Sequence, residues 1–328
     1  MYGRSAGLSP LAVVVAIFWS WSWGPIGLIL SMPLTLCLVV LGRHVERLEF
    51  LEVLLGDRPA LTPVESFYQR ILAGDADEAQ DHAELLLKER SLSSYYDEVA
   101  LRGLQLAAED AQRGVLHPEQ LERVKNTIKE LVPELDANDP REPASENSDE
   151  AIAPQHDVPD LPKVPASEGA EPEHEELVPA WRAGAEVLCL AGRGPLDEAA
   201  SAMLAQLLGK HGLRARTAQH EASSREAMDS LDVSEVTMVC ISHLEISGAP
   251  SHLRYLIRRL RRKLPHAPIL VGLWPADDEV LKEERVRGVI GADYYVTSLR
   301  EAVSFCVEAA HKIPEASGNA GPLEVAAA

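Results

Sequence analysis

The chain has 328 residues and a formal net charge of −20, from 31 Lys and Arg against 51 Asp and Glu. Its length predicts two or three domains. The acidic excess argues against a general nucleic-acid binder, because phosphate contacts need clustered basic side chains. The four cysteines lie far apart without a CxxC spacing, so neither a zinc knuckle nor a redox pair is predicted.

The segment Leu11–Leu41 carries no charged side chain. It is longer than the roughly 18 residues that indicate a membrane span, and longer than the apolar run of a signal peptide. Gly24 and Pro25 lie near its middle, where glycine bends easily and proline lacks the N–H that a helix needs. We therefore expect a hairpin of two membrane helices within residues 1–44.

The bend of this hairpin, called the membrane elbow below, is expected at Trp23, Gly24, Pro25, Gly27 and Pro33. Tryptophan gathers at the membrane interface, and a basic cluster that follows a span marks its cytoplasmic end. Such a cluster follows here, at Arg43, His44 and Arg47. These features predict a multi-pass protein of the cell inner membrane with a cytoplasmic C-terminus and the lipid bilayer as a partner.

Three short strings carry a resemblance to a known family. They are Gly7–Pro10, Trp23–Gly27 and Met32–Thr35. Together they resemble the last membrane segments of autoinducer-2 exporter-type permeases, and the residues after position 44 resemble the cytoplasmic extension of larger members. The resemblance implies small-molecule transport. It also implies further membrane helices, supplied by missing residues or by other copies in a homo-oligomer.

Residues 45–135 predict a cytoplasmic helical region, because apolar residues recur at helical spacing and turn residues separate the segments. The expected helices are Pro63–Leu72, Ala76–Arg90, Tyr95–Gln112 and Pro118–Leu131. Residues 136–180 are rich in proline and acidic residues, with Arg141 and Lys163 as the bases. Such a segment predicts a disordered linker.

Residues 181–313 alternate between short apolar strands and helices, which predicts a parallel sheet covered on both faces. The expected fold is a doubly wound, flavodoxin-like α/β domain, followed by a disordered tail at 314–328. The expected strands are Glu186–Ala191, Arg214–Ala218, Val236–Ile241, Ile269–Leu273 and Tyr294–Thr297. The expected helices are Leu196–His211, ended by Gly212, then Ser223–Leu231, Pro250–Leu264, Asp278–Arg287 and Leu299–His311.

Ligands of such folds bind beyond the carboxyl ends of the strands. Those positions are Gly192–Pro195, Ser242–His243, Trp274–Pro275 and Thr297–Ser298. The sequence Gly192-Arg193-Gly194 fits either an ordinary turn or a phosphate site at a helix N-terminus, although Pro195 removes one N–H donor.

The strand–helix rhythm and the segment Leu207–Leu213 also resemble cobalamin-binding domains. Those domains place a cobalt-ligating histidine after the first strand, where this chain has Pro195–Ala200 without a histidine. A receiver-domain assignment also fails, because no acidic pair directly follows the first strand and no Asp ends the third. We therefore predict no catalytic, cofactor-binding or metal-binding residues, no cofactor and no enzyme activity.

One predicted helix is strongly basic. Arg254, Arg258, Arg261 and Arg262 share one of its faces by helical spacing. This face is either solvated or contacts an anionic surface, which can be lipid head groups or the acidic linker of the chain itself.

Two functions remain open at this point. The first is small-molecule transport across the inner membrane, with a non-catalytic cytoplasmic α/β domain and an unknown substrate. The alternative is a regulatory or ligand-sensing α/β module, anchored or soluble, without transport activity.

Overall fold

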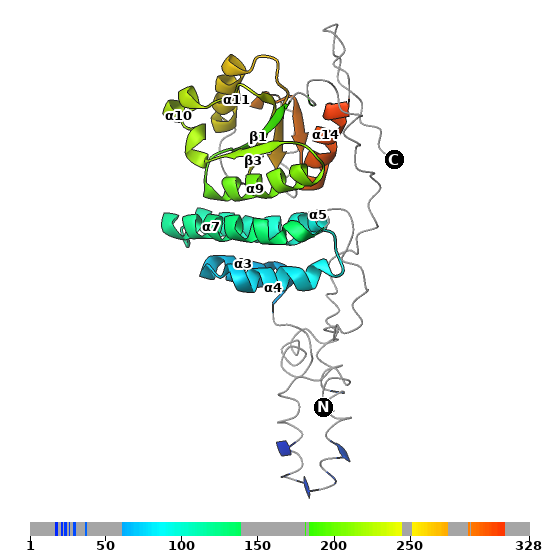
Figure 1. The fold of residues 1–328 in the computed structure, drawn as a ribbon. Coiled ribbons are helices and arrows are strands. Elements are labelled where there is room, and N and C mark those ends of the chain that lie inside the picture. Colours follow the sequence, from blue (N-terminus) through cyan, green and yellow to red (C-terminus); the bar gives the residue numbers. More distant parts are fainter. Residues whose placement is uncertain are drawn as a thin grey trace. The chain divides into compact units, whose positions relative to one another are not determined.

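The structure is a computed structural model (Figure 1). It describes residues 61–138, 181, 184–244, 251–274, 288 and 290–311, together with residues 17, 18, 21, 23, 24, 26, 29, 30 and 37. Residues 64–138 and the described residues from 181 onward belong to one compact unit.

The first part of the unit is helical. It contains α3 (Pro63–Ala73), α4 (Ala76–Leu87), α5 (Leu92–Tyr95), the π-helical turn η2 (Tyr96–Ala100), α6 (Leu101–Gln112), α7 (Pro118–Glu134) and the 3-10 turn η3 (Leu135–Ala137). The helices expected from the sequence in this region are confirmed, although η2 interrupts the third of them.

Local chemistry explains where these helices begin and how they pack. The side chain of Asp75 accepts a hydrogen bond from the N–H of Glu78 and caps α4. Gly74 adopts a φ of 81° in the turn before it, in the left-handed region that glycine favours. Gly103 faces the ring of Phe67, where a Cβ would lie 2.5 Å from a ring carbon, so this glycine lets α3 approach α6 closely.

The second part is an α/β layer. Its strands are β1 (Glu186–Ala191), β2 (Ala215–Ala218), β3 (Val236–His243), β4 (Ile269–Leu273) and β5 (Tyr294–Val296). Its helical elements are α9 (Pro195–Lys210), the 3-10 turn η4 (His220–Ser223), α10 (Arg225–Ser230), α11 (Ser251–Lys263) and α14 (Leu299–His311). The expected strands are confirmed within two residues at each end. The expected helix Asp278–Arg287 lies outside the described residues.

The five strands pair in parallel in the order β2-β1-β3-β4-β5. Alternate side chains of each strand point to opposite faces. Val239 and Ile241 lie in the apolar core beneath α10 and α11. Cys240 points to the other face, where its sulfur lies 3.5 Å from that of Cys306 in α14. Helix α9 packs on this same face.

The helical part covers the face of the α/β layer that carries α9 and α14 (Figure 1). Gln206 of α9 donates a hydrogen bond to the carbonyl of Val132 in α7 and accepts one from Tyr96, both at 2.5 Å. Asp97 accepts hydrogen bonds from the N–H groups of Leu299 and Arg300 at the start of α14. The two parts therefore share a polar seam as well as apolar contacts.

The fold class expected from the sequence is wrong. That expectation combined two membrane helices in a hairpin, a small all-α region and a separate flavodoxin-like α/β domain. In the described part of the chain, no helix has the length and apolar character needed to cross a membrane. The helices of residues 63–134 also do not form a separate region, because α7 packs along α9 and the described helices and sheet form one unit. The same finding contradicts the expected transmembrane helices and the expected permease character of the chain.

Three of the five residues of the membrane elbow lie outside the described residues, namely Pro25, Gly27 and Pro33. Trp23 and Gly24 are described. Trp23 is helical and 61% exposed, and Gly24 has a φ of 65°, in the left-handed region that suits a bend.

Candidate functional site

The carboxyl ends of β1 and β3 meet at the switch point of the sheet. The chain leaves β1 for β2 on one side, whereas β3, β4 and β5 follow on the other. Parallel α/β sheets bind ligands in the crevice at such a point, because the connections there diverge and leave space between them. A ligand site is therefore expected at this edge of the sheet.

A cavity of about 290 Å³ lies at this edge. Its floor is the β1–α9 turn and Leu244, the residue after β3, and its cover comes from α6 and α7. Apolar side chains form most of the lining, at Ala108, Ala111, Leu121, Pro195, Leu196 and Leu244. The polar side chains in the lining are Gln112, Arg193 and Asp197. A volume near 300 Å³ is at the lower end for small-molecule sites.

Asp197 fixes the geometry of the cavity floor. It lies in the first turn of α9 and is 4% exposed. One carboxylate oxygen accepts hydrogen bonds from the N–H groups of Arg193 at 2.8 Å and Gly194 at 3.4 Å. The other oxygen accepts from the N–H of Leu244 at 2.8 Å. Asp197 thus ties the end of β3 to the β1–α9 turn.

This geometry decides between the two interpretations of Gly192-Arg193-Gly194. The N–H groups that a phosphate would need are already bonded to the carboxylate of Asp197. Gly192 is packed closely, because a Cβ there would lie 2.8 Å from the carbonyl oxygen of Ser242 and 3.1 Å from His243 Nδ1. The segment is therefore a structural turn, closed by an acidic side chain of the chain itself.

Three buried polar atoms near this edge have no hydrogen-bond partner. They are Ser242 Oγ, His243 Nδ1 and Trp274 Nε1. His243 Nδ1 lies 3.9 Å from the nearer oxygen of Asp197, which is too long for a hydrogen bond. Buried polar groups are normally paired, so unpaired ones commonly mark a place for a ligand or water.

The remaining expected strand ends have structural roles. Trp274 packs its ring over Gly272, and its carbonyl accepts a hydrogen bond from Gln105 of α6. Ser298 caps α14 by accepting from the N–H of Glu301, whose carboxylate binds back to the N–H of Thr297. Pro275 lies outside the described residues.

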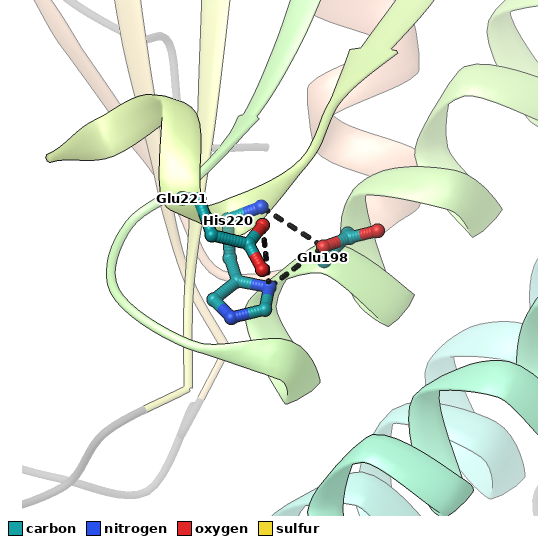
Figure 2. Close-up of side chains that lie close together, drawn as sticks. All are labelled: Glu198, His220 and Glu221. Atoms are coloured by element: carbon teal, nitrogen blue, oxygen red, sulfur yellow. Dashed lines mark hydrogen bonds and ion pairs between the residues drawn. The ribbon is translucent and has the colours of Figure 1, made fainter. Parts of the chain in front are cut away.

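A second cluster lies at the carboxyl end of β2. Glu198, the residue after Asp197, is 2% exposed and meets His220, the first residue of η4 (Figure 2). One oxygen of Glu198 accepts from the backbone N–H of His220 at 2.9 Å and lies 2.8 Å from its ring Nδ1. A carboxylate oxygen of Glu221 lies 3.4 Å from the same ring nitrogen.

Helix α7 completes the surroundings of this cluster. Lys129 lies 3.1 Å from the other oxygen of Glu198. Glu122 lies 3.6 Å from His220 Nε2 and pairs with Lys125 at 2.5 Å. Burial alone would raise the pKa of Glu198, but the hydrogen bonds from His220 and Lys129 outweigh it and the pKa is lowered. Glu198 is therefore a buried carboxylate that stays charged near neutral pH.

Sequence reasoning missed both acidic residues and His220. The available signal was positional: Asp197 and Glu198 lie in the first turn of the helix after β1, and His220 comes two residues after the end of β2. Both places are carboxyl ends of parallel strands, where ligands bind. The sequence gives no sign that α7, about 70 residues before Glu198, contributes side chains to the surroundings of this cluster.

The basic helix α11 uses its arginines in different ways. Arg261 donates to the carbonyl of Ala267 and pairs with Asp293, so it is committed within the fold. Arg258 and Arg262 are exposed, and the guanidinium of Arg254 lies 5.3 Å from the ring centre of Tyr255. Arg258 and Arg262 are the exposed part of the predicted anionic-surface contact, which stays a prediction.

No family model and no curated protein matches the chain. Among solved structures, it is similar to a novel cobalamin-binding protein from Desulfitobacterium hafniense DCB-2. The two share 13% sequence identity with a TM-score of 0.30, over 74% of this chain and 96% of the other. A similarity at this level carries no argument about fold or ligand.

Proposed function

We propose that this chain contains a ligand-sensing α/β module whose cavity at the β1–β3 switch point binds a small molecule. The observation that carries the proposal is the position of the cavity, between the carboxyl edge of the sheet and its helical cover. This function corresponds to the regulatory alternative from the sequence. It needs neither a transport path nor a catalytic group.

The lining favours a small, mostly apolar ligand with one polar end. Alanine, leucine and proline side chains supply the apolar surface, and Gln112 and Arg193 offer hydrogen-bond donors beside it. Asp197 contributes shape more than recognition, because three backbone N–H groups already bind its carboxylate.

The position of the cavity, between the helical part and the α/β layer, supports a sensing role. Residues of α6 and α7 and residues of the β1–α9 turn line the same cavity, so a ligand contacts both parts of the unit at once. Binding therefore stabilises the packed arrangement of helices and sheet by mass action. Such a ligand can change the surface that the unit offers to a partner.

Thermal unfolding of the full chain with a panel of small metabolites tests this function. A ligand of the cavity raises Tm in a concentration-dependent way. Ala111→Phe fills the cavity and should abolish the shift, whereas Ala73→Phe makes the same change at an exposed position at the end of α3. A Tm shift that survives Ala111→Phe would place the ligand elsewhere and refute the assignment.

A further inference from the structure

The cluster at the end of β2 has a property that the proposed function does not use. The imidazole of His220 has carboxylates on both sides. Glu198 and Glu221 lie 2.8 Å and 3.4 Å from Nδ1, and Glu122 lies 3.6 Å from Nε2. A neutral imidazole has one N–H and one lone pair, so it can donate to the carboxylates on one side only.

A metal cation on Nδ1 resolves this conflict without a second ring proton. The lone pair of Nδ1 then binds the cation, the ring proton resides on Nε2, and that N–H points toward Glu122. Metal-binding histidines show this pattern, with the second ring nitrogen donating to a carboxylate. The carboxylate of Glu122, supplied by α7, would orient the ring.

The ligand atoms lie close to the spacing of a tetrahedral site, and the shorter separation must open by about 0.5 Å to reach it. Zinc binds nitrogen and carboxylate oxygen at about 2.0–2.2 Å, so two ligands of a tetrahedron lie about 3.3–3.6 Å apart. The separations from His220 Nδ1 to Glu198 and Glu221 are 2.8 Å and 3.4 Å, and all three ligand atoms lie within 4.8 Å of one another. Figure 2 shows both carboxyl groups directed toward the ring.

Two of the three ligands are held in place before any metal arrives. Glu198 is buried, and its oxygen also accepts the backbone N–H of His220, which ties the two residues together. Ser223 donates to the carbonyl of His220 at 2.7 Å and closes the η4 turn. Glu221 is 65% exposed and can adjust. Lys129 pairs with the other oxygen of Glu198, so it offsets charge without blocking the ligand atom.

We propose that Glu198, His220 and Glu221 bind a divalent first-row transition metal ion, with zinc as the best fit. One nitrogen and two carboxylate ligands suit zinc, whereas calcium and magnesium need six or more oxygens. Three protein ligands leave a fourth position for water or for a polar group of another molecule. On binding, the metal takes the lone pair of Nδ1 in the neutral ring, whose one proton resides on Nε2, so the ring itself releases no proton.

Titration of the chelator-treated full chain with Zn²⁺ alone, followed by calorimetry, and with Co²⁺ alone, followed by visible absorption, tests this site. We expect one equivalent to bind, with the intense visible bands of tetrahedral Co²⁺. His220→Ala should weaken Zn²⁺ binding by about 100-fold or more, and Glu221→Gln by about 10-fold. Glu122→Gln should weaken it by about 10-fold and keep the stoichiometry.

His266→Ala is the matched control, because His266 is exposed and lies outside the cluster. It should bind Zn²⁺ like the parent chain. If His220→Ala does not fold by circular dichroism, Glu221→Gln decides the question, because Glu221 is mostly exposed. Absence of saturable binding, or unchanged affinity in Glu221→Gln and His220→Ala, would overturn the site. Ala111→Phe should leave Zn²⁺ binding unchanged, so failure of the cavity and failure of the metal site are distinguishable.

Discussion

The carboxyl ends of β1 and β2 each hold one buried acidic residue, and the two residues are neighbours in α9. Asp197 faces the β1–β3 switch point and is bonded to three backbone N–H groups. Glu198 faces β2 and is bonded to the side chains of His220 and Lys129 and to one backbone N–H, that of His220. Backbone donors cannot leave without distorting the fold, whereas side chains can rearrange. The first site is therefore a fixed structural joint, and the second can exchange its partners for a ligand.

The largest effect is expected from Asp197→Ala. The change leaves three N–H groups of the β1–α9 turn and the end of β3 without their acceptor, in a buried setting. We expect it to lower the free energy of unfolding by about 3–5 kcal/mol, measured by urea denaturation. Asp197→Asn keeps part of the acceptor geometry and should cost less. A loss below about 1 kcal/mol for the alanine variant would show that Asp197 is not a joint.

Asp97 of η2 extends the comparison to a third carboxylate, which is partly buried against the start of α14. Burial raises its pKa to about 6 from 3.8, against the effect of the N–H groups of Leu299 and Arg300. The folded chain thus holds an extra proton between about pH 4 and pH 6. The contribution of Asp97 to the free energy of unfolding is complete below its pKa in the unfolded chain. It is lost as pH rises through its pKa in the folded chain. The size of the shift corresponds to about 3 kcal/mol.

Asp97→Asn cannot titrate, so the difference in unfolding free energy between parent and variant isolates this group. We expect the parent to lose about 3 kcal/mol relative to the variant between about pH 4 and pH 7. Urea denaturation across this range measures the difference. A difference that is constant with pH would contradict the assignment.

Glu198→Gln should have a smaller effect on the free energy of unfolding, and this effect should depend on pH in the opposite direction. The pKa of Glu198 is lowered, so its contribution is present above its ordinary value of 4.5 and is lost as pH falls through the folded pKa. We expect a loss of about 2 kcal/mol near pH 7 that shrinks in acid. An equal loss at acidic and neutral pH would mean that packing, and not charge, dominates at this end of β2.

The smallest effects concern the surface of α11. Arg261→Glu removes a hydrogen bond to Ala267 and the ion pair with Asp293, and should cost about 1 kcal/mol. Arg262→Glu changes an exposed residue on the same helix and should stay within about 0.5 kcal/mol. Thermal unfolding compares the two variants. Equal effects would show that charge alone, without the specific contacts of Arg261, determines the result.

Much of the α/β layer was predictable, because its strands are short apolar runs between turn residues. The strand β1 is buried along nearly its whole length, which matches its continuous apolar sequence. The helix α9 also ends where Gly212 predicted, since Gly212 adopts a φ of 77°. Local patterns of this kind determine local structure.

The site was not predictable in the same way, because it depends on contacts between distant segments. Leu121 and Ala108 line the cavity, and Glu122 and Lys129 surround the cluster, yet all four precede the acidic linker. Nothing in their local sequence indicates that α7 packs along α9. The expected membrane hairpin was inferred from an uncharged apolar run with a Gly24-Pro25 bend and from a family resemblance, and most of it lies outside the described residues.

The seam between α7 and α9 has a consequence for protein engineering. Gln206 binds Val132 across the stretch of chain that contains the acidic linker, and Tyr96 binds Gln206 across an even longer one. A chain cut between positions 138 and 181 should therefore give two fragments that reassemble when mixed. Fused to the halves of a split reporter, such fragments would turn ligand or metal binding at this seam into a measurable signal.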